Sequence, residues 1–161
     1  MFERDEAKLG KRIGETVGGL IGREVTLKAL PANARTLAPS VSAMFGAHGV
    51  RTAIRVEADL ACAAAMGASI AMIPASRVKD VVAAGKLDSD LAENAQEVFN
   101  VMTRALAMDG SIRAKLDKFS AVETPAAAPA KHDLAWEVTI AGYGAGKLAL
   151  TFTFKPPGSA S

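Results

Sequence analysis

Four polar residues in the second half of the chain recur at three- and four-residue spacing: Glu93, Glu97, Asn100 and Arg104. An α-helix turns about 100° per residue, so this spacing places the four side chains on one face as a continuous polar strip. A carboxylate in such a strip can pair with a cationic group of a partner. The carboxamide of Asn100 cannot act as a general base, but it can accept one hydrogen bond from water and donate another. The strip could therefore bind a charged partner and orient a water molecule.

The segment that carries the strip has the periodicity of an amphipathic helix over residues 87–106. Its apolar residues fall on the opposite side by three- and four-residue steps, and we expect them to face the core: Leu91, Ala95, Val98, Met102 and Ala105. Any amphipathic helix also has a solvated polar face, so the spacing alone proves no activity.

Two residues of the strip also have structural interpretations. Asp90 is followed three residues later by Glu93, just ahead of the apolar run, which resembles a capping box at the start of a helix. Arg104 would either contact an acidic surface of a partner or stabilise the end of the helix through the helix dipole. The sequence alone does not decide between a structural role and a partner-binding role for Glu93 or for Arg104.

The motif Glu97-Val98-Phe99-Asn100, preceded by Glu93, resembles the Glu-x-x-Asn signature of the CheC/CheX family of chemotaxis phosphatases. That family has Asp or Ser where Glu93 stands, and often a glycine near the position of Arg104. In CheX-like proteins the helix gives way to a strand and then a proline loop, which is similar to residues 114–125 here. The resemblance covers most of the chain.

The resemblance implies a CheX-like phosphatase that hydrolyses the aspartyl phosphate of a CheY-type response regulator. Asn100 would orient the attacking water and Glu97 would dock the receiver by pairing with its active-site lysine, with Glu93 and Arg104 as further partner-binding residues. The protein would need no cofactor of its own, because the phosphorylated receiver supplies Mg²⁺. It also implies a possible homodimer. The alternative is a non-catalytic binding module of the same fold in chemotaxis or flagellar-switch signalling.

The pattern of apolar residues in the rest of the chain predicts an α+β fold, with a largely antiparallel sheet and helices packed on one side. We expect the order α-β-β-β-α-α-β-β-β in one domain over residues 1–154, followed by a disordered tail over 155–161. The elements are a helix over 3–21, strands over 24–30, 50–57 and 60–73, a helix over 75–84, the helix over 87–106, a strand over 112–122 and a hairpin of 134–140 with 148–154. A surface loop is expected over 31–49, and a row of glycines, Gly10, Gly14 and Gly18, is expected to allow close helix packing.

The composition excludes several classes of function. Half of the 161 residues are apolar and the net charge is +2, so nothing points to nucleic acid or to an anionic membrane. The charged N-terminus and the lack of a long apolar stretch predict a cytoplasmic protein without a membrane span. Cys62, the single cysteine, is expected in the core. His48 and His132 are expected at the surface, with no metal site.

Overall fold

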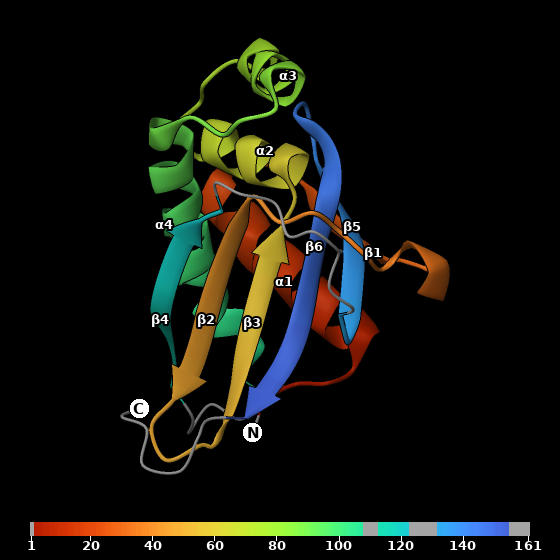
Figure 1. Cartoon of the computed structure of the whole chain (residues 1–161), viewed down its shortest axis with the longest axis vertical. Coiled ribbons are helices and arrows are strands. Elements are labelled where there is room, and N and C mark those ends of the chain that lie inside the picture. Colours follow the sequence, from red (N-terminus) through yellow and green to blue (C-terminus); the bar gives the residue numbers. More distant parts are fainter. Residues whose placement is uncertain (1, 108–112, 123–131, 155–161) are drawn as a thin grey trace.

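The computed structural model describes residues 2–107, 113–122 and 132–154. Figure 1 shows one sheet with helices behind it and a further helix, α3, at one end. The elements are α1 Glu6–Ile21, β1 Val25–Ala29, a 3₁₀ turn Ala32–Ala34, β2 Val41–Ala47, β3 Thr52–Ala58, α2 Leu60–Ile70, α3 Ala75–Ala84, α4 Ser89–Leu106, β4 Ala114–Ala121, β5 Leu134–Ile140 and β6 Gly144–Phe154.

The six strands form one antiparallel sheet in the order β1-β5-β6-β3-β2-β4. Within the described residues β1 and β4 are its two edges. Helix α1 packs on β1, α2 on β6 and α4 on β4, so these three helices cover the same face, while α3 packs on α2 (Figure 1). The expected α+β class, with an antiparallel sheet and helices on one side, is confirmed.

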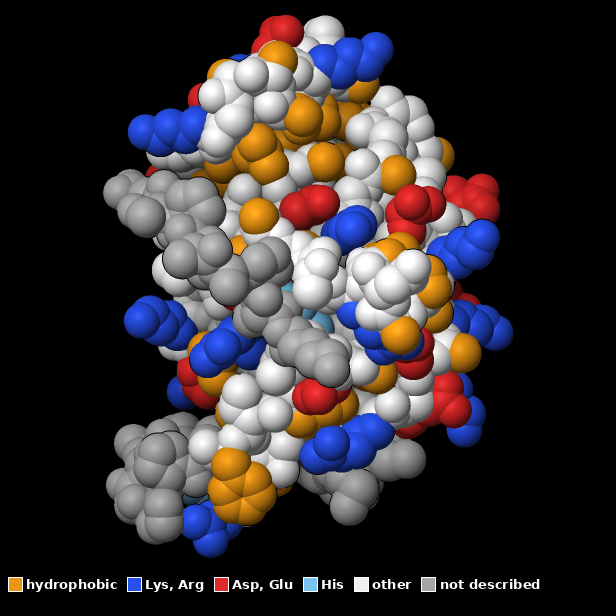
Figure 2. All heavy atoms as spheres, turned by 45° about the vertical axis from the view of Figure 1, so that its right-hand side comes forward, with side chains coloured by type: hydrophobic (Ala, Val, Ile, Leu, Met, Phe, Trp, Pro, Cys, Tyr) orange, Lys and Arg blue, Asp and Glu red, His pale blue; other side chains and the backbone are white. Residues whose placement is uncertain are grey.

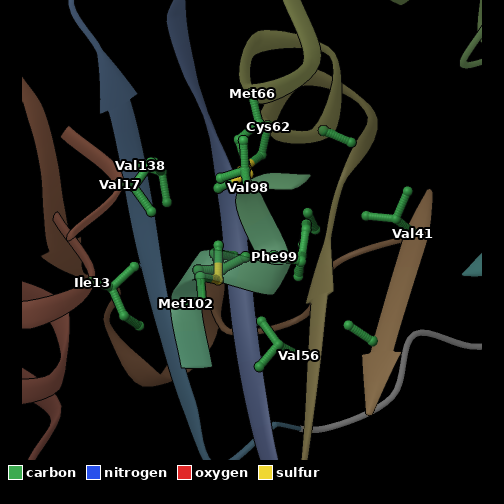
Figure 3. Packing of buried hydrophobic residues seen from close by; sticks show 14 of the residues in the cluster. Ile13, Val17, Val41, Val56, Cys62, Met66, Val98, Phe99, Met102 and Val138 are labelled. Carbon is green, nitrogen blue, oxygen red and sulfur yellow. The ribbon is translucent and has the colours of Figure 1, made fainter. Parts of the chain in front are cut away.

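The core lies between this sheet face and the three helices. Figure 3 shows Ile13 of α1 and Met102 of α4 pointing towards the strands, with Cys62 and Met66 of α2 above them. Ile13, Met66 and Met102 are fully buried. Burying an aliphatic side chain of this size stabilises the fold by roughly 1.5–3 kcal/mol. The same packing fixes which side of α4 remains in contact with solvent.

The glycine row of α1 permits close backbone packing, as expected. A Cβ atom added at Gly10 would lie 2.8 Å from the indole nitrogen of Trp136, and one at Gly14 would lie 2.8 Å from the carbonyl oxygen of Val25. The helix begins after Asp5, whose side chain accepts a hydrogen bond from the Lys8 amide. It is therefore held directly against β1 and β5.

Most of the segment 60–73, predicted as a central strand, forms helix α2 over Leu60–Ile70 instead. The Asp59 side chain caps this helix by accepting a hydrogen bond from the Cys62 amide at 2.9 Å. Alanine, the strongest helix former, dominates the segment. Its residues are buried on nearly every side between α4 and the sheet, so no polar face marks the helical period. Three helices, not two, therefore separate β3 from β4.

The loop predicted over residues 31–49 is shorter, because Val41–Ala47 forms strand β2. Val41, Ala43 and Phe45 are fully buried at alternate positions and face the helices. The residues between them are only half buried, and small side chains in the segment weaken the contrast that a strand usually shows in sequence. The strand lies between β3 and β4, so it is central to the sheet.

Several other predictions agree with the structure. The hairpin is formed by β5 and β6, α3 ends at Gly85 in the left-handed conformation, and the strand expected near 112–122 is β4. Ile112 and the expected tail over 155–161 lie outside the described residues. Among the residues that the structure describes, no helix combines the length and apolar character needed to cross a membrane.

The sheet face opposite the helices carries scattered charges and one buried polar pair. In the view of Figure 2, Lys, Arg, Asp and Glu side chains are spread over the visible face, and apolar side chains gather towards the end where α3 lies. The prediction of a surface histidine is wrong for His132, which is 6% exposed. Its Nε2 lies 2.9 Å from Oε1 of Glu57, across strand β6. His48 is exposed, as predicted.

Candidate functional site

The four residues of the polar strip are all exposed on α4. The opposite side of the helix is buried as predicted, and Figure 3 shows Val98, Phe99 and Met102 directed into the core. Within the described residues the Glu97 and Asn100 side chains have no hydrogen-bond or ion-pair partner. A carboxylate and a carboxamide, one helical turn apart, are thus available to a binding partner.

A shallow pocket of about 190 Å³ lies between α4 and the edge strand β4. It is lined by Gln96, Glu97, Asn100, Leu116, Asp117, Lys118 and Phe119. The structure therefore brings Glu97 and Asn100 to one hollow. Glu93 and Arg104 lie outside it, one turn before Glu97 and one turn after Asn100 on the same exposed strip. Sequence reasoning missed Asp117, which the strand brings to the same pocket.

An aromatic contact fixes the distance between α4 and β4. The rings of Phe99 and Phe119 lie 5.4 Å apart between centroids and are tilted by 56°. This arrangement is favourable for aromatic pairs and adds about 0.5–1.5 kcal/mol to the apolar burial. Phe99 immediately precedes Asn100, so the buried ring positions the exposed amide beside the sheet edge.

The first half of α4 is tied to α2. Nδ2 of Asn94 donates a hydrogen bond to the carbonyl oxygen of Gly67 at 3.2 Å. At Gly67 the two backbones touch, since an added Cβ atom would overlap the carbonyl oxygen of Leu91. Leu91 itself is fully buried. These contacts leave α4 little freedom to slide along the core.

The capping box that the sequence of Asp90 and Glu93 resembles is not formed. The N-cap of α4 is Asp88, and its side chain makes no capping hydrogen bond. Asp88 and Asp90 instead pair with Arg77 of α3, at 2.6 and 3.3 Å. The hydrogen bond to Asp88 is the main reason that the pKa of the Arg77 guanidinium is raised. Glu93 therefore has no capping role and stands exposed.

The C-terminal end of α4 is held by the start of the chain. The Glu3 amide donates a hydrogen bond to the carbonyl oxygen of Leu106 at 3.1 Å. The Arg12 guanidinium donates to the carbonyl oxygen of Ala107. These bonds satisfy carbonyl groups that a helix end would otherwise leave unpaired. Arg104, in the last turn, is exposed and favourably placed for the helix dipole.

The metal-ligating and nucleophilic side chains of the described residues are the next candidates for a site. No three His, Cys, Asp or Glu side chains gather there as a metal site would require. Burial, with a smaller contribution from the Asp59 charge, raises the pKa of the Cys62 thiol well above its usual 9.0. A thiol in this state is a poor nucleophile. A larger hollow of about 580 Å³ lies between α1 and β1, beside the glycine row.

Comparison with known proteins identifies the fold. Neither a protein-family model nor a curated protein matches the sequence. Among solved structures, FliY of Thermotoga maritima matches with a TM-score of 0.61 and 14% identity, over 92% of this chain and 89% of that chain. The chemotaxis protein CheX of Desulfovibrio desulfuricans matches with a TM-score of 0.54 and 13% identity, over 91% and 97% of the two chains. The fold is CheC/CheX-like.

The CheC/CheX-like fold is also similar to that of a FliM middle domain. The FliM middle domain of Vibrio alginolyticus matches with a TM-score of 0.55 and 6% identity, over 92% of this chain and 89% of that chain. At these identities the likeness establishes the architecture alone. The function must therefore be argued from the residues that this CheC/CheX-like domain presents beside α4.

Proposed function

We propose that the protein is a CheX-like phosphatase that hydrolyses the aspartyl phosphate of a CheY-type response regulator. The observation that carries the proposal is the exposure of Glu97 and Asn100 beside one pocket at the sheet edge, without partners among the described residues. Their order and spacing match the Glu-x-x-Asn signature to which the sequence is similar. The CheC/CheX-like fold supports the same assignment.

The reaction needs little from the protein beyond positioning. An acyl phosphate carries a good leaving group, and the receiver supplies its own Mg²⁺. The oxygen of a water molecule attacks phosphorus, and the bond from phosphorus to the aspartyl oxygen breaks. The carboxylate leaves with the electron pair, and the water proton passes to the phosphate product. Asn100 holds that water in line by accepting one of its hydrogen bonds, a role that a carboxamide can fill.

Glu97 has the separate role of docking the receiver. Its carboxylate lies one helical turn before Asn100 and reaches the same pocket. A charge-assisted pair with the lysine of the receiver's active site would place the phosphoryl group opposite Asn100. Glu93 and Arg104 extend the strip on either side and would contact the rim of the partner. Because these outer residues lie beyond the pocket, their contribution is to affinity.

The test is the lifetime of a phosphorylated receiver. CheY-type receivers are phosphorylated with acetyl phosphate and mixed with the wild type, Asn100→Ala or Glu97→Ala. We expect Asn100→Ala to lose acceleration on the order of 100-fold with little change in KM, because water positioning acts on the chemical step. We expect Glu97→Ala to raise KM about tenfold, because it removes a docking charge.

The control is Glu15→Ala, which removes an exposed carboxylate from α1, outside the pocket between α4 and β4. It should leave both kinetic parameters unchanged. Melting temperatures of all variants show whether the fold is intact. Equal phosphate lifetimes with the wild type, Asn100→Ala and Glu97→Ala would overturn the proposal.

A second candidate function is a non-catalytic binding module. The observation that favours it is the shared architecture with the FliM middle domain and FliY, whose structures resemble this chain as well as CheX does. The same strip would then dock a receiver or a flagellar-switch component without chemistry. Binding of a beryllofluoride-activated receiver, measured together with an unchanged phosphate lifetime, would favour this module over the phosphatase.

A further inference from the structure

Strand β4 contains a β-bulge beside the pocket. Its pairing with β2 runs from Met44 with Lys118 to Phe45 with Leu116, so Asp117 has no partner residue. The shift keeps Leu116 on the helix-covered face with Phe45, and Lys118 on the opposite face with Met44. The extra residue between them is displaced from the regular alternation of the strand. Asp117 consequently contributes to the lining of the α4–β4 pocket.

The Asp117 carboxylate is only loosely engaged within the protein. Its side chain is 33% exposed, and within the described residues its ion-pair partner is Nζ of Lys115 at 3.9 Å. Lys115 is itself 70% exposed, so solvent screens this pair and it restrains Asp117 weakly. A carboxylate on the edge strand therefore faces the same pocket as Glu97 on the helix and remains available to a partner.

We infer that Asp117 is a second docking residue, which together with Glu97 binds the basic group next to the phosphorylated aspartate of the receiver. The inference rests on the proposed function and deepens it. Two carboxylates from different elements accept hydrogen bonds from an ammonium group along separate directions, which fixes its position better than one carboxylate does. Such an arrangement also disfavours partners that present an acidic group at this point.

A bulge also has a structural use, because it blunts an exposed sheet edge against pairing with other chains. Protection of the sheet edge requires the irregular backbone and does not depend on the charge of residue 117. The docking role requires the charge. The two are separated by Asp117→Asn, which keeps the size and shape of the side chain while removing the negative charge.

The experiment compares Asp117→Asn with Glu137→Gln, which removes the charge of an exposed carboxylate on β5, outside the α4–β4 pocket. Dissociation constants for a beryllofluoride-activated CheY-type receiver are measured over a range of salt concentrations, together with dephosphorylation kinetics. We expect Asp117→Asn to weaken binding about three- to tenfold, to reduce the dependence of binding on salt, and to leave kcat unchanged. Glu137→Gln should bind as tightly as the wild type.

Each outcome separates this inference from the proposed function. Unchanged affinity and salt dependence in Asp117→Asn, in a protein whose activity still requires Asn100, overturns the docking role and leaves the phosphatase standing. Weaker, less salt-dependent binding in Asp117→Asn, with no effect of Asn100→Ala on phosphate lifetime, supports the docking role and overturns the phosphatase. An equal loss of affinity in Glu137→Gln would show that removing any exposed carboxylate weakens binding, and it would also overturn the docking role.

Discussion

Gly67 and Leu91 bring helices α2 and α4 into direct backbone contact, since a Cβ atom added at Gly67 would overlap the carbonyl oxygen of Leu91. Asn94 secures the same contact by its hydrogen bond to the Gly67 carbonyl oxygen. The consequence reaches the candidate site, because α4 carries Glu97 and Asn100. The position of both side chains relative to the sheet edge depends on the absence of a side chain at Gly67.

Gly67→Ala should therefore destabilise the protein. The added methyl group meets backbone atoms that cannot move aside cheaply, and overpacking of this kind costs about 1–3 kcal/mol in the free energy of unfolding. The matched control is Gly19→Ala in α1, where an added Cβ atom meets nothing within 4 Å. That substitution should stabilise the protein by about 0.5–1 kcal/mol through helix propensity. Urea unfolding measures both, and a shift of the same sign in the two variants would contradict the packing argument.

Asp59 joins the start of α2 to strand β6. Its Oδ1 atom accepts hydrogen bonds from the backbone amides of Cys62 and Lys147, at 2.9 and 3.0 Å. Asp59→Ala should lower the free energy of unfolding by about 2 kcal/mol or more, because both amides lose their acceptor. Asp59→Asn retains an oxygen in the same place and should cost much less. Thermal or urea unfolding of the two variants tests this prediction. An equal loss of stability in Asp59→Ala and Asp59→Asn would show that the side-chain oxygen at this position does not stabilise the protein.

Glu57 and His132 form a buried pair, so their substitutions should not be additive. His132→Ala leaves the Glu57 carboxylate, only 8% exposed, without its partner, and should cost about 3 kcal/mol. Glu57→Gln keeps an acceptor for the imidazole and should cost about 1 kcal/mol. A double-mutant cycle in urea should give a coupling energy of about 0.5–3 kcal/mol. A coupling energy near zero would contradict the hydrogen bond.

The buried thiol of Cys62 should make the free energy of unfolding depend on pH. Burial raises the pKa of its thiol above the usual value of 9.0, so the folded protein holds the proton after the unfolded chain has released it. The stability from this effect is complete below about pH 9 and is lost as pH rises towards the folded pKa. The stability difference between wild type and Cys62→Ala should therefore shrink between about pH 7 and about pH 10. A constant difference would contradict the raised pKa.

Periodicity predicted α4 well because one side of that helix is apolar and the other is polar. The same method failed at residues 60–73, where neighbours cover every side of α2 and no polar face survives. The signals that were available are Asp59, a good N-cap, and the run of alanines. Strand β2 was missed for a related reason, since the small residues of Val41–Ala47 resemble those of a loop.

The candidate site was only partly accessible from sequence. Glu97 and Asn100 lie on one helix, so their proximity follows from local geometry. Asp117 reaches their pocket through a register shift between β2 and β4, which depends on pairing across the sheet. The burial of His132 likewise depends on Glu57, which is 75 positions away in the chain. The capping-box interpretation of Asp90 and Glu93 was wrong, because Arg77 of α3 pairs with Asp88 and Asp90 at the start of α4.

Trp136 offers a direct optical readout of how α1 sits on the sheet. It is the single tryptophan of the chain, it is almost fully buried, and its indole nitrogen donates a hydrogen bond to the carbonyl oxygen of Glu6 at 3.1 Å. Gly10 leaves just enough room for the ring. Intrinsic fluorescence therefore reports the local environment of this helix without any attached dye. A red shift of the emission maximum would register the lifting of α1 from β5 even while the rest of the chain kept its secondary structure.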